Sequence, residues 1–378
     1  MFRDAFAKLA RRIGSARHAA RVQALHQQGT SAYRAGRYAE AARCAEQAVA
    51  LDQTSAEAQL LLGTTRLVLR EFNAADTAFA ASLALKPEYP LVLYAMMLRA
   101  LARARADLAS GRTPQAAVAE PDTHRRVSII VCSVDPQLFA QVCANYRAVF
   151  AAVPHEIIGI HDARSLCEGY NRGIARASGD LLVFSHDDIE IATPDFAARL
   201  LGHLNRYDLV GVAGTTRLIG GSWTCAGWPH LHGQVGSRIS KPGSLIVTVY
   251  GPHSTAAVEV QAIDGVFLAM RREVLERIAF DEQTFDGWHL YDLDFTFSAH
   301  LAGFRAAVCQ DVCLVHNSLG DYRADWQQYV QRFEDKHRSR LQGGKWQAQQ
   351  RCAVEVASPA EWVLMTEEMI SKGEERPG

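Results

Sequence analysis

The pattern of apolar and polar residues changes near residue 127. Before this point, small and apolar residues recur every three or four positions, which is the period of amphipathic helices. Beyond it, short runs of β-branched and apolar residues, such as VSIIVCSV at residues 127–134, alternate with helical stretches. Such runs are typical of strands that are buried on both faces of a parallel sheet. The pattern therefore predicts a helical region followed by an α/β domain.

An internal repeat occupies most of the helical region. Residues 29–53 align with residues 63–87 at an offset of 34 residues, so that Gly29 falls on Gly63. Small residues in the first copy would let two antiparallel helices approach closely: Ala41, Ala45 and Ala48. The period and the pattern resemble tetratricopeptide repeats. We therefore expect an all-α repeat domain at residues 23–108.

The second copy departs from the repeat pattern at two positions. Arg66 and Arg70 stand where an aromatic residue and a glycine are usual. A further helix at residues 91–109 would cover the exposed end of such a short solenoid. Repeats of this type bind a peptide or partner protein on their concave face, or serve only as a spacer. The sequence leaves both roles open.

Two segments flank the repeats. Residues 1–22 have the pattern of a basic amphipathic helix, with Lys8, Arg11 and Arg12 off the apolar face. Such a helix either anchors a protein to a membrane surface or caps the adjoining helical domain. Residues 109–126 are rich in alanine, proline and charge, which predicts a linker.

Polar residues follow the first three predicted strands of the α/β domain. They are Cys132–Asp135, His161 with Asp162, and His186–Asp188. Ligands of parallel α/β sheets bind at the carboxyl ends of the strands. Adjacent carboxylates at the end of a buried strand repel each other unless a cation or a substrate offsets the repulsion. One such group could be a solvated acidic turn, but the convergence of three groups favours a site.

Further candidates lie toward the end of the domain. Asp292 and Asp294 begin a predicted helix, where the helix dipole favours negative charge. The dipole is a sufficient explanation for Asp294, whereas Asp292 follows the turn at residues 287–289 and is a candidate for chemistry. His316 is expected to end a strand at residues 306–315. Two tryptophans would line a sugar-binding groove or pack in the core: Trp223 and Trp228.

Five segments occur in the order and approximate spacing seen in family 2-like glycosyltransferases with the GT-A fold. They are EIIGIHDA, YNRGIARASGDLLVFSHDD, AIDGVFLAMRREV, FDGWHLYDLDF and VHNSLG. The form SHDDIEI, with GVAGTTRLIGGSW downstream, is most similar to the StrF-type branch. The resemblance covers residues 127–321 and implies a Rossmann-like nucleotide-diphospho-sugar transferase domain. It also implies sugar transfer from a nucleotide-diphosphate donor to a hydroxyl acceptor.

The resemblance implies roles for single residues. Asp188 matches the last acid of the DxD-like motif, which holds Mn²⁺ or Mg²⁺ against the nucleotide diphosphate. His186 stands where the first acid of that motif is usual, and His316 matches a late histidine that completes the metal or diphosphate shell. Asp292 matches the aspartate of a Glu-Asp pair that acts as catalytic base, and Tyr291 replaces the glutamate. A single displacement assisted by this base predicts inversion at the anomeric carbon.

The resemblance also implies donor contacts. Asp162 matches the second-strand position that reads the nucleotide base. We further expect Ser133, Asn171 and Asp187 to contact the donor, which would be a UDP-, GDP- or dTDP-sugar. The acceptor would be a saccharide, a lipid carrier or a protein. The helical segment at residues 321–341 would cover the acceptor side. We expect residues 322–378 to form a helical extension and tail.

Composition narrows the setting of the protein. The formal net charge of −1 removes any general electrostatic case for nucleic-acid binding. The chain has eight cysteines without a CxxC pair. No apolar run approaches the roughly 20 residues that cross a bilayer. We therefore expect a protein of the cytoplasm, either free or peripheral at the inner membrane. The family resemblance implies that the protein is bacterial.

Two other functions stay open. A metal-dependent hydrolase could use the same histidines and aspartates. A non-catalytic scaffold could carry a degenerate transferase domain, and His186 and Tyr291 in place of acids favour that interpretation.

Overall fold

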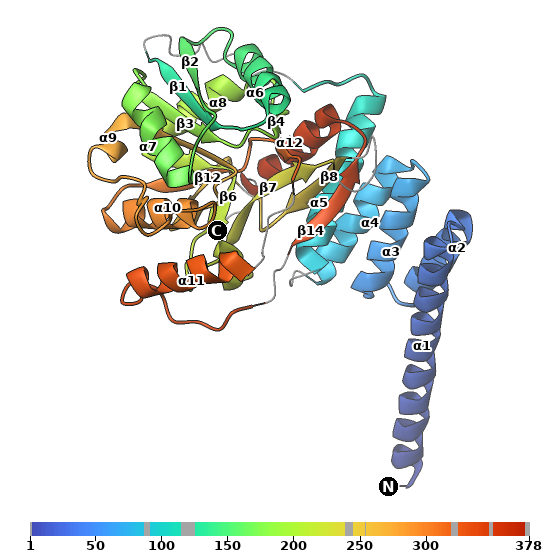
Figure 1. The fold of residues 1–378 in the computed structure, drawn as a ribbon. Helices are drawn as coiled ribbons and strands as arrows, with labels where there is room; N and C mark the ends of the chain where they lie inside the picture. Colours follow the sequence, from blue (N-terminus) through green and yellow to red (C-terminus); the bar gives the residue numbers. More distant parts are fainter. Residues whose placement is uncertain are drawn as a thin grey trace. The chain divides into compact units, whose positions relative to one another are not determined.

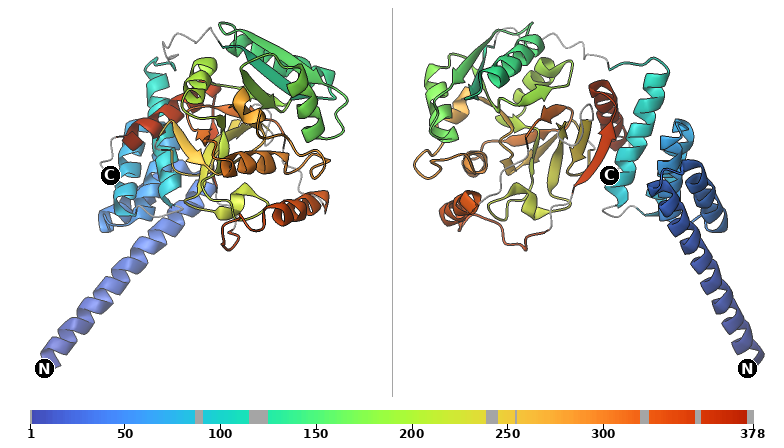
Figure 2. Two further views of the ribbon diagram at one scale, coloured as in Figure 1. Left: turned by 90° about the vertical axis from the view of Figure 1, so that its left-hand side faces the viewer. Right: turned by 45° about the vertical axis from the view of Figure 1, so that its right-hand side comes forward.

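The computed structural model describes residues 2–86, 91–114, 125–238, 245–253, 255–318, 324–347 and 351–374. The chain divides into two units, residues 1–113 and 114–378, which are drawn as ribbons in Figures 1 and 2. Within the described ranges, no helix combines the length and the hydropathy that crossing a membrane requires.

The described part of the first unit is helical, as predicted, and each helix packs on the next along the chain. The helices are α1 (Phe2–Arg34), α2 (Tyr38–Leu51), α3 (Ala56–Val68), α4 (Phe72–Leu85) and α5 (Leu91–Ala109). Small residues permit the close packing. A Cβ atom added at Gly29 would lie 2.9 Å from the Leu61 side chain, and one added at Gly63 would lie 2.6 Å from Phe79. The repeat prediction is therefore confirmed.

The amino-terminal segment is continuous with the repeats, because α1 runs unbroken from Phe2 to Arg34. The boundary that we expected between residues 22 and 23 is thus not a helix end. Side chains of residues 2–16 lie outside the described part of the structure, so the anchor and the cap both stay predictions. Most of the predicted linker, residues 115–124, also lies outside the described residues.

Helix α5 covers the second repeat, as expected for the added helix. Its residues Val92, Leu93 and Met97 are buried. On its other positions, Arg99 and Arg103 each place Nε 2.8 Å from Asp76 Oδ1 on α4. Apolar burial and this shared ion pair together fix α5 against α4.

The second unit is built on a mixed sheet in the order β2-β1-β3-β11-β5-β12-β9. Its first three strands are parallel, as predicted: β1 (Val127–Cys132), β2 (His155–Ile160) and β3 (Leu181–Ser185). The connecting helices are α6 (Pro136–Val149) and α7 (Leu166–Arg176). The remaining strands are β11 (Phe267–Arg271), antiparallel to β3, followed by β5 (Leu209–Gly211), β12 (Ala306–Cys309) and β9 (Ala257–Val260).

The sheet separates two apolar cores. Leu182 and Phe184 of β3 belong to the core that contains α7 and α10 (Tyr291–Leu301). Leu181 and Val183 belong to the core with α6 and α8 (Phe196–Leu204). Alternate residues of a strand point to opposite faces, so this apolar run is buried on both sides.

A second sheet adjoins the first, in the order β10-β6-β7-β13-β4, with β8 paired to β7 and β14 paired to β8. Its strands are β4 (Ile189–Ile191), β6 (Ala213–Thr215), β7 (Leu231–Ser237), β8 (Leu245–Val249), β10 (Ala262–Ile263), β13 (Leu314–His316) and β14 (Cys352–Val356). The short helices are η1 (Trp223–Ala226) and α9 (Arg272–Leu275), and the carboxyl-terminal helices are α11 (Ala324–His337) and α12 (Pro359–Glu374).

The prediction of one strand at residues 306–315 is wrong. The segment forms two strands, β12 in the first sheet and β13 in the second, and residues 310–313 turn between them. A continuous apolar run does not reveal such a break, because both halves are buried. The break has a consequence for the site: β13 pairs antiparallel with β4, which places His316 opposite Ile189.

The expected helical extension and tail at residues 322–378 contains a strand as well. Helices α11 and α12 form, but β14 is a strand that extends the second sheet. Trp362 of α12 is fully buried, and its Nε1 donates a hydrogen bond of 2.7 Å to Gln234 Oε1 on β7. These residues therefore complete the core of the second unit.

The equivalent residues Gly36 and Arg70 lead to a stability prediction. Both follow the first helix of a repeat, and their φ angles are 75° and 65°. A side chain in this left-handed region costs about 1–2 kcal/mol, more than the extra backbone entropy that glycine loses on folding. We predict that Arg70→Gly raises the free energy of unfolding of the helical unit by about 0.5–1 kcal/mol, measured by urea denaturation followed by circular dichroism.

Gly36→Ala is the matched control. No atom lies within 4 Å of a Cβ atom at Gly36, so this change tests the backbone conformation alone. It should lower the stability by a similar amount. A less stable Arg70→Gly variant would contradict the argument.

Candidate functional site

The site forms where the two sheets meet. Strand β3 belongs to the first sheet and ends at Ser185, and β4 begins at Ile189 in the second sheet. The three residues between them are His186, Asp187 and Asp188. The buried strand thus delivers these polar side chains to the edge at which α/β proteins bind ligands.

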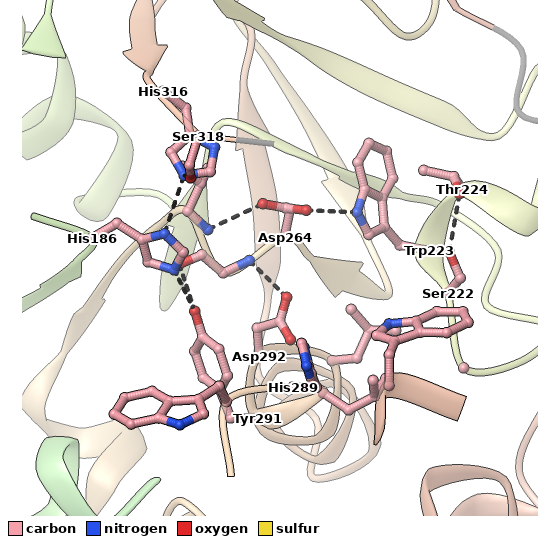
Figure 3. Close-up of a pocket in the computed structure, with 17 residues that line it drawn as sticks. His186, Ser222, Trp223, Thr224, Asp264, His289, Tyr291, Asp292, His316 and Ser318 are labelled. Carbon is pink, nitrogen blue, oxygen red and sulfur yellow. Dashed lines mark hydrogen bonds between the residues drawn. The ribbon is translucent and has the colours of Figure 1, made fainter. Parts of the chain in front are cut away.

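Three predicted metal ligands lie together. His186 Nδ1 is 3.2 Å from His316 Nε2 and 3.9 Å from Asp188 Oδ1. His316 Nε2 lies 3.4 Å from the same carboxylate oxygen. One ligand atom from each residue lies within 4.8 Å of the others, and Figure 3 shows the two imidazoles facing each other. The pairing of β13 with β4 brings these residues together across 128 positions of sequence, from Asp188 to His316.

The protonation states in this cluster suit a cation. Burial, together with the neighbouring His316, lowers the pKa of His186, so its imidazole is neutral at neutral pH. Burial alone would raise the pKa of Asp188, but the contacts with His316 and Ser318 outweigh it and lower that pKa to about 2. Two imidazoles and an ionised carboxylate form a donor set that fits a divalent transition-metal ion. Metal binding itself stays a prediction.

Asp292 lies at the start of α10, on the other side of the cluster from β13. Its Oδ2 accepts a hydrogen bond of 2.7 Å from the Gly265 backbone N–H. Burial, and next the carboxylate of Asp264, raise the pKa of Asp292 to about 7. A carboxylate of this kind can accept a proton near neutral pH, which is the property of a general base.

Asp264 is a site residue that the sequence did not single out. It precedes β11, and its Oδ2 accepts a hydrogen bond of 2.8 Å from Trp223 Nε1 (Figure 3). Its Oδ1 accepts a bond of 3.1 Å from the Val266 backbone N–H. The signal that could have found it is its place in the segment AIDGVFLAMRREV, where an acid precedes a predicted strand.

Leu290 turns the chain into α10 with a left-handed backbone, at a φ of 61°. A non-glycine residue in this conformation costs on the order of 1–3 kcal/mol and persists where the surroundings enforce it. The Leu290 side chain is 5% exposed, so apolar packing supplies that enforcement. The turn places Tyr291 and Asp292 on the first turn of the helix, with both side chains toward the site (Figure 3).

Two adjoining cavities share His186 and Trp288. The first has a volume of about 330 Å³ and is lined by His186, His316 and the carboxylates of Asp264 and Asp292. Its aromatic lining residues are Trp223, Trp288, His289, Tyr291 and Trp326. The second has a volume of about 300 Å³ and lies at the ends of β1 and β3, with Cys132, Ser133, Val134 and Asp187 in its wall. Trp288 is 49% exposed, and the sequence did not single it out.

The residues predicted to contact the nucleotide-sugar donor divide into two groups. Ser133 and Asp187 line the second cavity, and Ser133 Oγ donates a hydrogen bond of 2.5 Å to Asp187 Oδ2. Asp162 is exposed and pairs with Arg172 at 2.7 Å, and Asn171 Nδ2 donates to Phe280 O at 2.9 Å. Neither Asp162 nor Asn171 lines either cavity. Their contacts with a donor stay predictions.

Asp294 has a structural role, because it joins α10 to α11. It is buried, and its Oδ1 lies 2.7 Å from His337 Nε2 and 2.8 Å from Lys336 Nζ on α11. Lys336 also bonds to Asp281 at 2.7 Å. These contacts hold α11 against α10 and so place Trp326 in the wall of the first cavity. This placement agrees with the expectation that the segment covers one side of the site.

The two tryptophans proposed for a groove differ in position. Trp223 is 7% exposed and packs on Tyr250 at a ring distance of 4.8 Å, yet one edge borders the first cavity. Trp228 does not line either cavity. Trp223 therefore packs in the core and also borders the cavity, while its contact with a sugar stays a prediction.

Comparisons with known proteins agree with this architecture. A profile for the glycosyltransferase-like family matches residues 128–337, and a tetratricopeptide-repeat profile matches residues 22–55. No curated protein sequence matches the chain. Similar solved structures include the mannosyltransferase PcManGT from Pyrobaculum calidifontis in complex with GDP-Man and Mn²⁺, at 15% identity and a TM-score of 0.37, covering 79% of this chain and 81% of that one.

Another similar structure is S. aureus TarS 1-349 in complex with UDP-GlcNAc, at 13% identity and a TM-score of 0.34, covering 56% of this chain and 66% of that one. The family profile spans more than half of the chain and coincides with the α/β unit built above. The chain therefore belongs to the glycosyltransferase-like family, with an α/β domain preceded by tetratricopeptide-type helices.

Proposed function

We propose that the second unit transfers a sugar from a nucleotide-diphosphate donor to an acceptor hydroxyl, with Asp292 as the general base. The observation that supports this most directly is the half-buried carboxylate of Asp292, whose pKa is raised to about 7, in a cavity that also contains His186 and His316. The base thus borders the same cavity as two of the predicted metal ligands. The third, Asp188, does not line this cavity but lies 3.4 Å from His316. Such a transfer needs both groups close to the reacting carbon.

The donor would lie across the second cavity. Ser133 and Asp187 are at the ends of β1 and β3, the usual side for nucleotide binding in α/β folds. The predicted ligands Asp188, His186 and His316 would hold a divalent ion beside the donor, where the two cavities adjoin at His186. When bound, the ion would neutralise the charge that develops on the leaving diphosphate. Because imidazole suits Mn²⁺ better than Mg²⁺, we propose Mn²⁺.

The acceptor would enter the first cavity. Among the described residues that line it, none is a lysine or an arginine, whereas Asp264 and Asp292 are both acids. This charge pattern disfavours a phosphate or carboxylate near the attacked position and supports an uncharged saccharide hydroxyl. Trp288 has an exposed face on which a sugar ring could stack. The saccharide could be free, or part of a lipid carrier or a protein.

The two carboxylates would have different tasks. Both oxygens of Asp264 already accept hydrogen bonds, from Trp223 and from Val266. Asp264 would therefore act on its neighbour, by disfavouring the charged form of Asp292. Asp292 would take the proton of the attacking hydroxyl. Asp292 as the base, with Asp264 held by these hydrogen bonds, favours a single displacement with inversion.

We also propose that the repeats recruit an acceptor or a partner protein and that the protein works in the cytoplasm. The tetratricopeptide match supports the first point. All eight cysteines are free, which suits a reducing compartment.

The base assignment leads to the first activity prediction. Asp292→Asn should lower kcat by about 10²–10⁴-fold, because the amide keeps the shape of the side chain but cannot accept the proton. The assay is Mn²⁺-dependent release of nucleotide from UDP-, GDP- and dTDP-sugars in the presence of saccharide acceptors. Asp335→Asn, an exposed aspartate on α11, is the control. Full turnover by Asp292→Asn would contradict the assignment, and phosphate release from simple esters without sugar transfer would indicate a hydrolase.

The raised pKa of Asp292 predicts a pH dependence. The base must be ionised, so kcat/KM should rise with pH around a midpoint near 7 and be lost as the pH falls below it. Asp264→Asn removes the neighbouring charge and should move this midpoint to lower pH. Rate profiles at saturating Mn²⁺ measure both effects. An unchanged midpoint in Asp264→Asn would show that Asp264 does not tune the base.

Ligand binding offers a test that needs no acceptor. UDP, GDP or dTDP together with MnCl₂ should raise the melting temperature of the chain, because a ligand that binds only the folded state stabilises it. The rise should be lost in Asp188→Asn, which removes the ionised ligand. Asp311→Asn, an aspartate that pairs with His203 away from both cavities, should keep it. A shift that is equal in wild type and Asp188→Asn would contradict the metal assignment.

A further inference from the structure

Two residues of the site depart from the pattern of the family, and they touch each other. His186 stands where an acid of the metal-binding motif is usual, and Tyr291 stands in place of the glutamate beside the base. His186 Nε2 lies 3.0 Å from the Tyr291 hydroxyl (Figure 3). Although 105 positions separate them in sequence, the two departures therefore form one contact.

The direction of that hydrogen bond follows from counting protons. A tyrosine hydroxyl has a single proton to donate. The Tyr291 hydroxyl also lies 3.0 Å from the carbonyl oxygen of Gly265, which can only accept. Tyr291 therefore donates to Gly265 and accepts from the Nε2–H of His186. This assigns His186 to the tautomer that is protonated on Nε2.

The tautomer decides what Nδ1 can do. A neutral imidazole with its proton on Nε2 has a lone pair on Nδ1. His186 Nδ1 is the atom that faces His316 Nε2 at 3.2 Å and Asp188 Oδ1 at 3.9 Å. A histidine binds a metal through this lone pair. Which nitrogen has the lone pair depends on the hydrogen bond that the other nitrogen makes.

The surroundings fix the hydroxyl in place. Tyr291 is 4% exposed, and its ring packs on Tyr170 at a centroid distance of 5.7 Å. A Cβ atom at Gly265 would lie 2.3 Å from the Tyr291 hydroxyl oxygen, so the absence of a side chain there permits the approach. The hydroxyl thus has little freedom to leave His186.

We propose that Tyr291 is a positioning residue that holds His186 in its metal-binding tautomer, and that this neutral pair replaces two acids of the family pattern. The proposal rests on the metal site of the proposed function. It also gives an electrostatic reason for tyrosine instead of glutamate at position 291. A glutamate at position 291 would add a carboxylate next to Asp292 and Asp264, whereas tyrosine adds no charge.

The test is a titration of the full-length chain with MnCl₂ alone, followed by calorimetry or by the electron paramagnetic resonance of free Mn²⁺. Tyr291→Phe keeps the ring and removes only the hydroxyl. Loss of such an outer contact weakens metal binding by about 10–100-fold, and we expect a loss in this range. Tyr329→Phe removes a hydroxyl that bonds to Asp286 instead, and should leave the Mn²⁺ affinity unchanged. Equal affinity in wild type and Tyr291→Phe would overturn the proposal.

A double-mutant cycle shows whether the hydroxyl acts through His186. In His186→Asp, which still offers a ligand but has no tautomer, adding Tyr291→Phe should change the affinity by less than about two-fold, because the interaction between the two residues is already gone. An equal loss in both backgrounds would mean that the hydroxyl acts through the fold, and would overturn the proposal.

Nitrogen NMR of the metal-free wild type tests the tautomer without any variant of Tyr291. The His186 signals, identified by their loss in His186→Asp, should show a proton on Nε2. A proton on Nδ1 would overturn the proposal and leave sugar transfer untouched. A wild-type chain that binds no Mn²⁺ would overturn the metal part of the proposed function together with this proposal, whereas metal-free nucleotide release would preserve the transferase assignment.

Discussion

The site depends on one interaction, the antiparallel pairing of β4 with β13. This pairing joins a segment that follows β3 to a segment more than a hundred residues later, and it sets His316 beside Asp188. The other described histidine near this carboxylate, His186, lies farther away, at 3.9 Å. Backbone hydrogen bonds between two short strands therefore fix the distance between the two groups that would grip a cation.

Much of this architecture could be predicted from local patterns. The apolar runs of β1, β2 and β3 and the polar residues at their ends are local features, and they identified Ser133, Asp187 and Asp188. The repeat was visible because its period is itself a sequence property. Asp292 and His316 were assigned roles because they match positions in a known family.

What could not be predicted depends on contacts across the sheets. Residues 306–315 look like one strand, because the residues on both sides of the turn between β12 and β13 are apolar and buried. The contact of His186 with Tyr291 and the effect of Asp264 on Asp292 arise only when the loop before β11 meets the start of α10. Considered singly in the sequence, His186 and Tyr291 in place of acids favoured a degenerate domain. In the folded protein they form a hydrogen-bonded pair.

Strand β14 and the buried Trp362 affect how the protein is made. The helical unit precedes the α/β unit, and its described helices pack mainly on their neighbours in sequence, so it can fold while the α/β unit is still being synthesised. The α/β unit differs, because its second sheet gains β14 and its core gains Trp362 only after all of its other described strands have been synthesised. During that interval β8 has an unpaired edge, where a nascent chain is most exposed to aggregation and to chaperone capture.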